Sequence, residues 1–152
     1  MKLKDITRKK GTYAALRVLQ PSCDNLYEHC KTANLPVTKS QFCERLHTTL
    51  IYSRKYCPKL FAEPGTLYEA TFKNYELFDD GKTLVALLNA PGIVARHLKL
   101  MALHGASYDF PVFNPHVTLS YDFKGDMLNL PIIDFPILLG KEYVEDLNLD
   151  WE

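Results

Sequence analysis

One pattern, H-x-T-L-x-Y, occurs twice in this sequence, as HTTLIYS at residues 47–53 and as HVTLSYD at residues 116–122. Both stretches are rich in β-branched and aromatic residues and alternate in the manner of a β-strand. Side chains two positions apart on a strand point to the same face, so each histidine lies beside the threonine of its motif. We also expect the tyrosine of each motif on that face. The repeat therefore predicts two strands that each present an imidazole next to a hydroxyl.

The order of elements around the motifs is the same in both halves of the chain. A helix pattern, at 21–34 in the first half and from Pro91 to about Gly105 in the second, is followed by a loop and then by the histidine-bearing strand. We interpret this order as an internal duplication. It predicts an α+β fold with two similar lobes of antiparallel sheet, related by an approximate two-fold axis, with the helices on the outside. The two histidines would then face each other near the axis.

The remaining segments complete the expected sheets. A strand is expected at 12–19, and residues 66–78 and 82–88 predict a hairpin that turns at Asp79-Asp80-Gly81. A last strand is expected near 132–139, followed by an acidic tail. No linker or low-complexity segment interrupts the chain, so we expect a single domain over residues 1–152.

The composition limits the classes of function. With 47% hydrophobic and 24% charged residues, the chain has the balance of a globular protein. The sequence has no apolar run near the roughly 18 residues of a membrane span, and its opening MKLKD lacks the apolar core of a signal peptide. We therefore expect a cytoplasmic protein with reduced cysteines and no membrane partner. A net charge of zero argues against binding of long nucleic acid, and no obligate protein partner is predicted.

The residues of the two motifs suit the cleavage of a phosphodiester. The attacking oxygen loses a proton on one side of phosphorus and the leaving oxygen gains one on the other, so two groups that titrate near neutrality are needed. His47 and His116 are the candidate acid and base, in either order. Thr49 and Thr118 would donate hydrogen bonds to the non-bridging oxygens, which gather charge in the transition state. These groups do the work that a cation does elsewhere, so we expect no metal and no other cofactor.

Three other interpretations of the motifs are compatible with the residues alone. A single His-x-Thr on a strand is usually a hydrogen-bonded structural pair. His47 and His116 with a third ligand would form a zinc site, although neither strand offers a carboxylate or thiol beside its histidine. A protein that only sequesters a nucleotide would need donors and aromatic rings in a pocket but no paired histidines. The duplication of the pair favours the enzyme.

With one H-x-T motif in each half of an α+β chain, the sequence resembles the two-histidine (2H) phosphoesterase superfamily. Its size, motif spacing and acidic-aromatic ending are most similar to phage anti-CBASS enzymes. This resemblance implies the 2H phosphoesterase (LigT-like) fold. It also implies a metal-independent phosphodiesterase that opens 3'-5' bonds of cyclic di- and trinucleotide immune messengers, such as 3',3'-cGAMP. The catalytic residues that it implies are His47, His116, Thr49 and Thr118.

The same resemblance implies a second set of residues that bind the substrate. These are Tyr13 and Trp151, on which bases would stack, and Glu145, six positions before the tryptophan. Two plainer roles compete with these: Trp151 docking the end of the chain onto the core, and Tyr13 packing within its strand. Among enzymes, the alternative is a 2H phosphoesterase acting on RNA 2',3'-cyclic phosphates or 2'-5' linkages.

Overall fold

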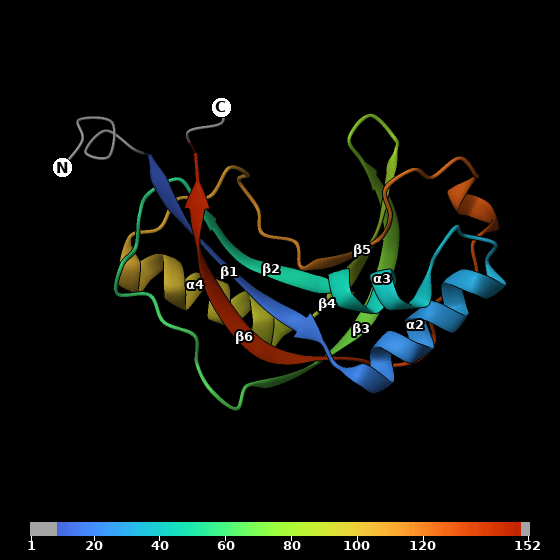
Figure 1. The fold of residues 1–152 in the computed structure, drawn as a ribbon, viewed down its shortest axis with the longest axis horizontal. Helices are drawn as coiled ribbons and strands as arrows, with labels where there is room; N and C mark the ends of the chain where they lie inside the picture. The colour runs from blue at the N-terminus through green and yellow to red at the C-terminus, as the bar shows by residue number, and fades with distance from the viewer. Residues whose placement is uncertain (1–8, 150–152) are drawn as a thin grey trace.

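The computed structural model describes residues 9–149, which form a single curved sheet with helices outside it (Figure 1). The strand order is β2-β1-β6-β3-β4-β5, and every neighbouring pair is antiparallel. The strands are β1 (Lys10–Val18), β2 (His47–Ser53), β3 (Leu67–Phe78), β4 (Thr83–Asn89), β5 (His116–Ser120) and β6 (Ile137–Asn148). The helices are α2 (Gln20–Thr32), α3 (Lys39–Arg45), α4 (Pro91–His104) and the short 3₁₀-helix η1 (Met127–Asn129).

The strand order is symmetric about its middle. We call β2, β1 and β6 lobe 1 and β5, β4 and β3 lobe 2, because reversing the order exchanges β2 with β5, β1 with β4 and β6 with β3. Each lobe contains a strand, a helical connection and a motif strand in sequence, which is β1 to β2 in lobe 1 and β4 to β5 in lobe 2. The two motif strands are thus the two edges of the sheet.

Curvature of the sheet brings these two edges together. The Thr48 hydroxyl, in β2, donates a hydrogen bond of 3.0 Å to the backbone carbonyl of His116, in β5. Thr48 is buried, so this bond lies between the lobes and not at their surface. Two motifs that are far apart in the sequence therefore begin side by side.

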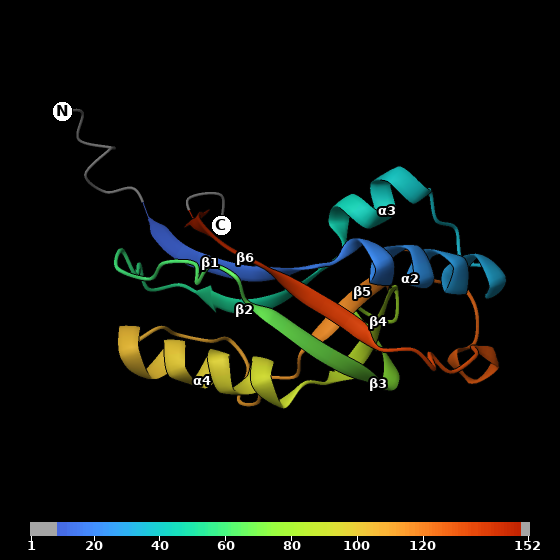
Figure 2. The same ribbon diagram turned by 90° about the horizontal axis from the view of Figure 1, so that it is seen from below.

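The helices pack on the sheet at opposite ends of the molecule (Figure 2). In α4, Pro91 occupies the first turn, Ile93, His97 and Leu100 form the buried stripe, and Gly105 ends the helix in the left-handed conformation. In Figure 2, α4 lies below β1 and β2 and so covers lobe 1. Helices α2 and α3 lie above the sheet at the opposite end of the molecule. Among the helices of residues 9–149, none combines the length and apolar content of a membrane span.

A buried ion pair fixes α4 to the central strand β6. The Arg96 guanidinium donates two hydrogen bonds to the Glu142 carboxylate, at 2.9 and 3.0 Å, and the backbone N–H of Glu63 donates a third at 2.6 Å. Hydrogen bonding to Glu142 is the main reason that the pKa of Arg96 is raised. Glu142 is therefore a structural anchor, although it falls in the segment that the sequence suggests is an acidic tail.

Two segments differ from the sequence-based expectation. The sequence predicts a loop before the first motif, but the structure has the helix α3 there, and its single buried side chain is Phe42. The sequence predicts the last strand near 132–139, whereas β6 runs from Ile137 to Asn148. Pro136 precedes it, and proline lacks the N–H that a strand within a sheet must donate. The hairpin of β3 and β4 and the helices α2 and α4 confirm the predictions for those segments.

Candidate active site

Both motif strands carry a β-bulge at the same position of the motif. In β2 the register passes from Ala15 opposite Thr49 to Ala14 opposite Ile51, which leaves Leu50 as the extra residue. The register of β5 with β4 has the same irregularity, and there the extra residue is Leu119. The two lobes thus share a local distortion as well as a sequence motif.

The bulges determine which way the motif tyrosines point. Strict alternation would place a residue five positions after a histidine on the opposite face of the strand. In β2, Leu50 and Ile51 are both buried, so the alternation shifts by one and Tyr52 returns to the face of His47. The ring of Tyr52 lies 6.4 Å from that of Tyr13, which is also 6.4 Å from the His47 ring. In lobe 1, His47 and Tyr52 thus share a face of the strand, as the sequence predicts, but they do so because of the bulge.

Each motif histidine is oriented by the same kind of hydrogen bond. Nδ1 of His47 lies 2.6 Å from the carbonyl oxygen of Arg45, and Nδ1 of His116 lies 2.9 Å from that of Asn114. A carbonyl can only accept, so Nδ1 is the protonated nitrogen in both rings. The other nitrogen, Nε2, is then a proton acceptor when the ring is neutral and a donor when it is charged. Either histidine can therefore act as acid or as base.

The surroundings of His116 favour its neutral imidazole. Burial lowers the pKa of His116, and the charge of His47 lowers it further, whereas the carbonyl of Asn114 and the carboxylate of Glu76 oppose the shift. The rings of Phe78 and His116 meet edge-on, at 5.1 Å between ring centres. Both histidines are nevertheless half-buried and not enclosed in the core. His116 therefore favours the neutral form more than an exposed histidine does.

The predicted substrate-binding residues have three different outcomes. Tyr13 lies within the site, where its hydroxyl shares a hydrogen bond of 3.1 Å with that of Thr49. Burial raises the pKa of Tyr13, which keeps this hydroxyl protonated. Glu145 is exposed on β6, directly opposite Tyr13 in the register. Trp151 lies outside the described residues.

The threonines of the motifs share their position but not their contacts. Thr49 and Thr118 are both half-buried, each two residues after its histidine and just before the bulge. The bond to Tyr13 fixes the hydroxyl of Thr49. In lobe 2 the position equivalent to Tyr13, two residues before the partner of the motif threonine, is Thr83, and its hydroxyl donates to Asp79 at 2.8 Å instead.

Sequence reasoning missed two residues of this face, Arg17 and Tyr143. Arg17 is opposite His47 in the register of β1 and β2, and its guanidinium lies 4.6 Å from the centre of the Tyr143 ring. Tyr143 belongs to the segment that was expected to be an acidic tail, so it had no predicted strand. For Arg17 the available signal was the alternation of β1, in which it shares a face with Tyr13.

A cavity of about 480 Å³ adjoins His116. Aromatic and aliphatic side chains dominate its wall, joined by two carboxylates and an amide. Its lining consists of Glu76, Phe78, Asp79, Tyr108, Phe110, Pro111, Val112, Asn114 and His116. Lobe 2 thus offers an apolar recess beside its motif histidine.

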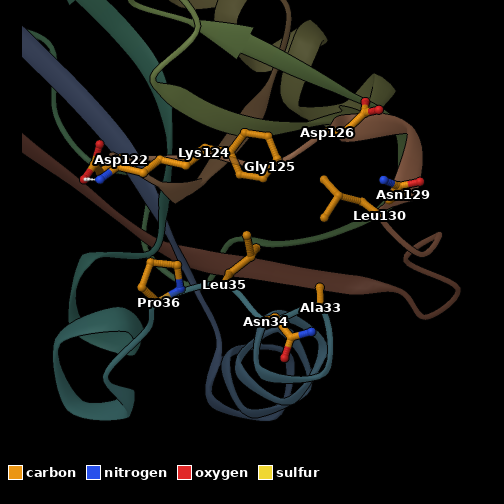
Figure 3. A pocket seen from close by; sticks show the side chains of 11 residues that line it. Ala33, Asn34, Leu35, Pro36, Asp122, Lys124, Gly125, Asp126, Asn129 and Leu130 are labelled. Atoms are coloured by element: carbon orange, nitrogen blue, oxygen red, sulfur yellow. Dashed lines mark ion pairs between the residues drawn. The ribbon is translucent and has the colours of Figure 1, made fainter.

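A larger cavity, of about 750 Å³, lies away from the motifs (Figure 3). It opens between residues 33–36, at the end of α2, and residues 122–130, which follow β5. Figure 3 shows the Asp122–Lys124 ion pair, of 3.7 Å, at its edge. No motif histidine or threonine lines this space, so its size is not evidence for the site of chemistry.

Metal-binding side chains do not gather within residues 9–149. In that range there is no group of three histidine, cysteine, aspartate or glutamate residues that could hold an ion. The four cysteines are free thiols, and three of them are buried. The described site consists of imidazoles, hydroxyls, aromatic rings and the guanidinium of Arg17.

Comparison with known proteins identifies the family. Residues 10–152 match the family described as Anti-CBASS protein Acb1. The chain belongs to this family. It is 35% identical to the Anti-CBASS protein Acb1 of Acinetobacter phage Ac42, over 100% of this chain and 99% of that protein. It is 33% identical to the protein of the same name from Enterobacteria phage T4, over 99% of this chain and 96% of that one.

The fold of this Acb1-family chain has a solved counterpart. It is similar to the crystal structure of Escherichia coli LigT in apo form, with a TM-score of 0.55 over 93% of this chain and 96% of that one. Sequence identity over this superposition is 10%, so the likeness concerns the fold alone. It confirms the predicted LigT-like α+β architecture.

Proposed function

We propose that this protein is a metal-independent phosphodiesterase that hydrolyses 3'-5' bonds of cyclic di- and trinucleotide immune messengers, such as 3',3'-cGAMP. Acting in the cytoplasm of the bacterial host, it would lower the concentration of the messenger. The observation that carries the proposal is the pair of imidazoles, each held by Nδ1 on a carbonyl two residues earlier. The relatives' shared name, Anti-CBASS protein Acb1, supports the biological setting.

The proposed mechanism uses the two Nε2 atoms on either side of one phosphate. One imidazole, neutral, takes the proton from the attacking oxygen, and the other, charged, gives a proton to the leaving oxygen. Their Nδ1 bonds support both roles, because the carbonyl acceptors hold each ring in place and stabilise its charged form. The lowered pKa of His116 suits it to be the neutral partner at neutral pH.

Thr49 and Thr118 would bind the non-bridging oxygens of the same phosphate. Each hydroxyl lies on the face of its histidine, two residues along the strand. Fixed donors stabilise the charge that these oxygens gain in the transition state, and they cost no reorganisation during the reaction. A hydroxyl already held by Tyr13, as in Thr49, is such a fixed group.

The deciding experiment is chromatography of 3',3'-cGAMP after incubation with the protein in the presence of a chelator. We expect linear products from the wild-type protein and intact substrate from the His47→Ala and His116→Ala variants. Recovery of unaltered cGAMP after denaturation of a wild-type complex would instead indicate a protein that sequesters the messenger. Parallel incubations with RNA 2',3'-cyclic phosphates and 2'-5' linked oligonucleotides identify the alternative enzyme class if only these are cleaved.

A further inference from the structure

We propose that Arg17 binds a phosphate of the substrate other than the one being cleaved, and that it thereby selects ligands with more than one phosphate. This inference rests on the proposed function. Cyclic di- and trinucleotides contain at least one phosphate besides the reacting one, whereas a nucleoside 2',3'-cyclic phosphate contains none. A cation placed beside the reacting pair, but not belonging to it, would distinguish these classes.

The position of Arg17 places it next to the reacting pair. Arg17 and His47 are directly paired across β1 and β2, so their side chains leave the same side of the sheet. Paired Cα atoms of antiparallel strands are about 4.5–5.5 Å apart. Arg17 is exposed. An anion beside the His47 ring, outside the space between the imidazoles, is therefore within reach of the guanidinium.

Aromatic rings hold the guanidinium in place. Arg17 lies over the ring of Tyr143 at 4.6 Å, and the centre of that ring is 6.3 Å from that of Tyr13. The hydroxyl of Tyr13 bonds to Thr49, so a line of contacts connects Arg17 to the first motif. Stacking on a ring restrains the side chain but leaves its N–H groups available for an anion. Within residues 9–149, Arg17 forms no ion pair with a carboxylate.

The other lobe shows that this cation is not part of the shared chemistry. The residue paired with His116, at the position equivalent to Arg17, is Leu87, which is buried. Both lobes have the histidine, the carbonyl bond to Nδ1, the threonine and the bulge, and these suffice for proton transfer at phosphorus. A group present in only one lobe serves a part of the substrate that only that lobe contacts. The chemistry of a guanidinium indicates that this part is a phosphate.

The test is steady-state kinetics on 3',3'-cGAMP with Arg17→Gln and Arg17→Lys. A contact to a non-reacting phosphate is equally strong in the ground state and the transition state, so its loss raises KM and leaves kcat unchanged. We expect Arg17→Gln to raise KM by about tenfold or more, the usual effect of losing a hydrogen bond to a charged group. Arg17→Lys keeps the charge but not the planar donor pair, so its KM should lie between those of the wild-type protein and Arg17→Gln.

Two controls separate this role from a structural one. Lys99→Gln removes an exposed cation from α4 and should change neither kcat nor KM. Raising the salt concentration should raise KM of the wild-type protein more than KM of Arg17→Gln, because one charge contact is missing from the variant. A fall in kcat as large as the fall in kcat/KM would place Arg17 at the reacting phosphate and overturn the inference. Unchanged kcat and KM would overturn it too, while a wild-type protein inactive on cGAMP would refute the proposed function itself.

Discussion

In lobe 1 the neighbour of the motif histidine on the adjacent strand is Arg17, whereas in lobe 2 it is Leu87. A polar and aromatic set, Tyr13 and Tyr143 with Arg17, surrounds the first motif. The second motif adjoins an apolar cavity of about 480 Å³. The surroundings of the two histidines differ, but each imidazole is held by the same hydrogen bond, from Nδ1 to the carbonyl two residues earlier.

The difference teaches which parts of the site depend on the reaction and which depend on the substrate. Proton transfer on two sides of one phosphorus needs two similar groups, and the duplicated features of the lobes provide them. A cyclic oligonucleotide presents different groups on its two sides, since phosphates, sugars and bases are not arranged symmetrically about one reacting bond. The features that occur in one lobe only are therefore the candidates for recognition of the substrate.

The sharpest test of the shared features is removal of either histidine. We expect His47→Ala and His116→Ala each to reduce kcat on 3',3'-cGAMP by about 10²- to 10⁴-fold, the contribution of one positioned acid or base. The double variant should be little worse than either single one, since proton transfer on both sides is needed for each turnover. Full activity of either single variant would break the equivalence of the lobes.

Removal of the motif hydroxyls should have a smaller effect. Thr49→Ala and Thr118→Ala should each reduce kcat by roughly ten- to a hundredfold, as expected for one hydrogen bond to a charged oxygen.

Tyr13→Phe keeps the ring but removes the partner of Thr49, so it should lower kcat by less than Thr49→Ala does. When Thr49 is already alanine, adding Tyr13→Phe should cost nothing further in kcat. Additive effects of the two changes would show that Tyr13 does not act through Thr49.

The pH dependence of stability tests two histidines with lowered pKa values, the buried His97 of α4 and the half-buried His116 of β5. Burial is the main cause of the lowered pKa of His97 and His116, from an ordinary value of 6.5. A histidine with a lowered pKa binds fewer protons in the folded state than in the unfolded chain, so stability is lost as the pH falls below about 6.5. Each such group contributes at most about 1.4 kcal/mol per pH unit to the free energy of unfolding. Urea unfolding between pH 8 and pH 5 measures the loss.

His97 allows the contribution of lobe 1 to be separated. Its Nδ1 donates to the carbonyl of Leu50, the bulge residue of β2, at 2.6 Å, and its ring stacks on Phe113 at 3.9 Å. Replacing His97 by glutamine removes the titrating group, so the variant should have a shallower dependence on pH than the wild-type protein. The same slope in both proteins would assign the pH dependence to other groups.

The smallest expected effect concerns a contact between the lobes. The guanidinium of Arg45, just before the first motif, lies 5.2 Å from the ring centre of Tyr121, at the end of the second. Both side chains are exposed, so the interaction should stabilise the fold by only about 0.5–1 kcal/mol. A double-mutant cycle with Arg45→Gln and Tyr121→Leu, measured by urea unfolding, isolates this coupling. A coupling of zero would mean that the pair does not connect the lobes.

The parts of the fold that the sequence predicted have strong local patterns. The repeated motif identified β2 and β5, and the turn residues between β3 and β4 identified the hairpin. Pro91 and Gly105 marked the two ends of α4. The pairing of the motifs could also be expected, because a duplicated unit implies an axis between its copies. These predictions needed only local chemistry and the repeat.

Other features depend on contacts that the sequence does not display. Only one side chain of α3, Phe42, is buried, so this helix has no apolar stripe to predict it. In β6, Lys141 has a positive φ of 49° and the register with β1 shifts, which disrupts the alternation on which a strand prediction relies. The register of β1 with β2 pairs Arg17 with His47, and register is a property of the assembled sheet.

The curvature that joins the motifs has a second effect, on self-association. Strands β2 and β5 are the edges of the sheet, and an edge strand in a flat sheet offers free backbone groups to any extended polypeptide. Here the two edges meet, and the hydroxyl of Thr48 donates a hydrogen bond to the backbone carbonyl of His116. Where the motifs begin, each edge thus leaves less room for a foreign strand to pair with the other. The same closure that assembles the site therefore covers part of the two sheet edges that carry its histidines.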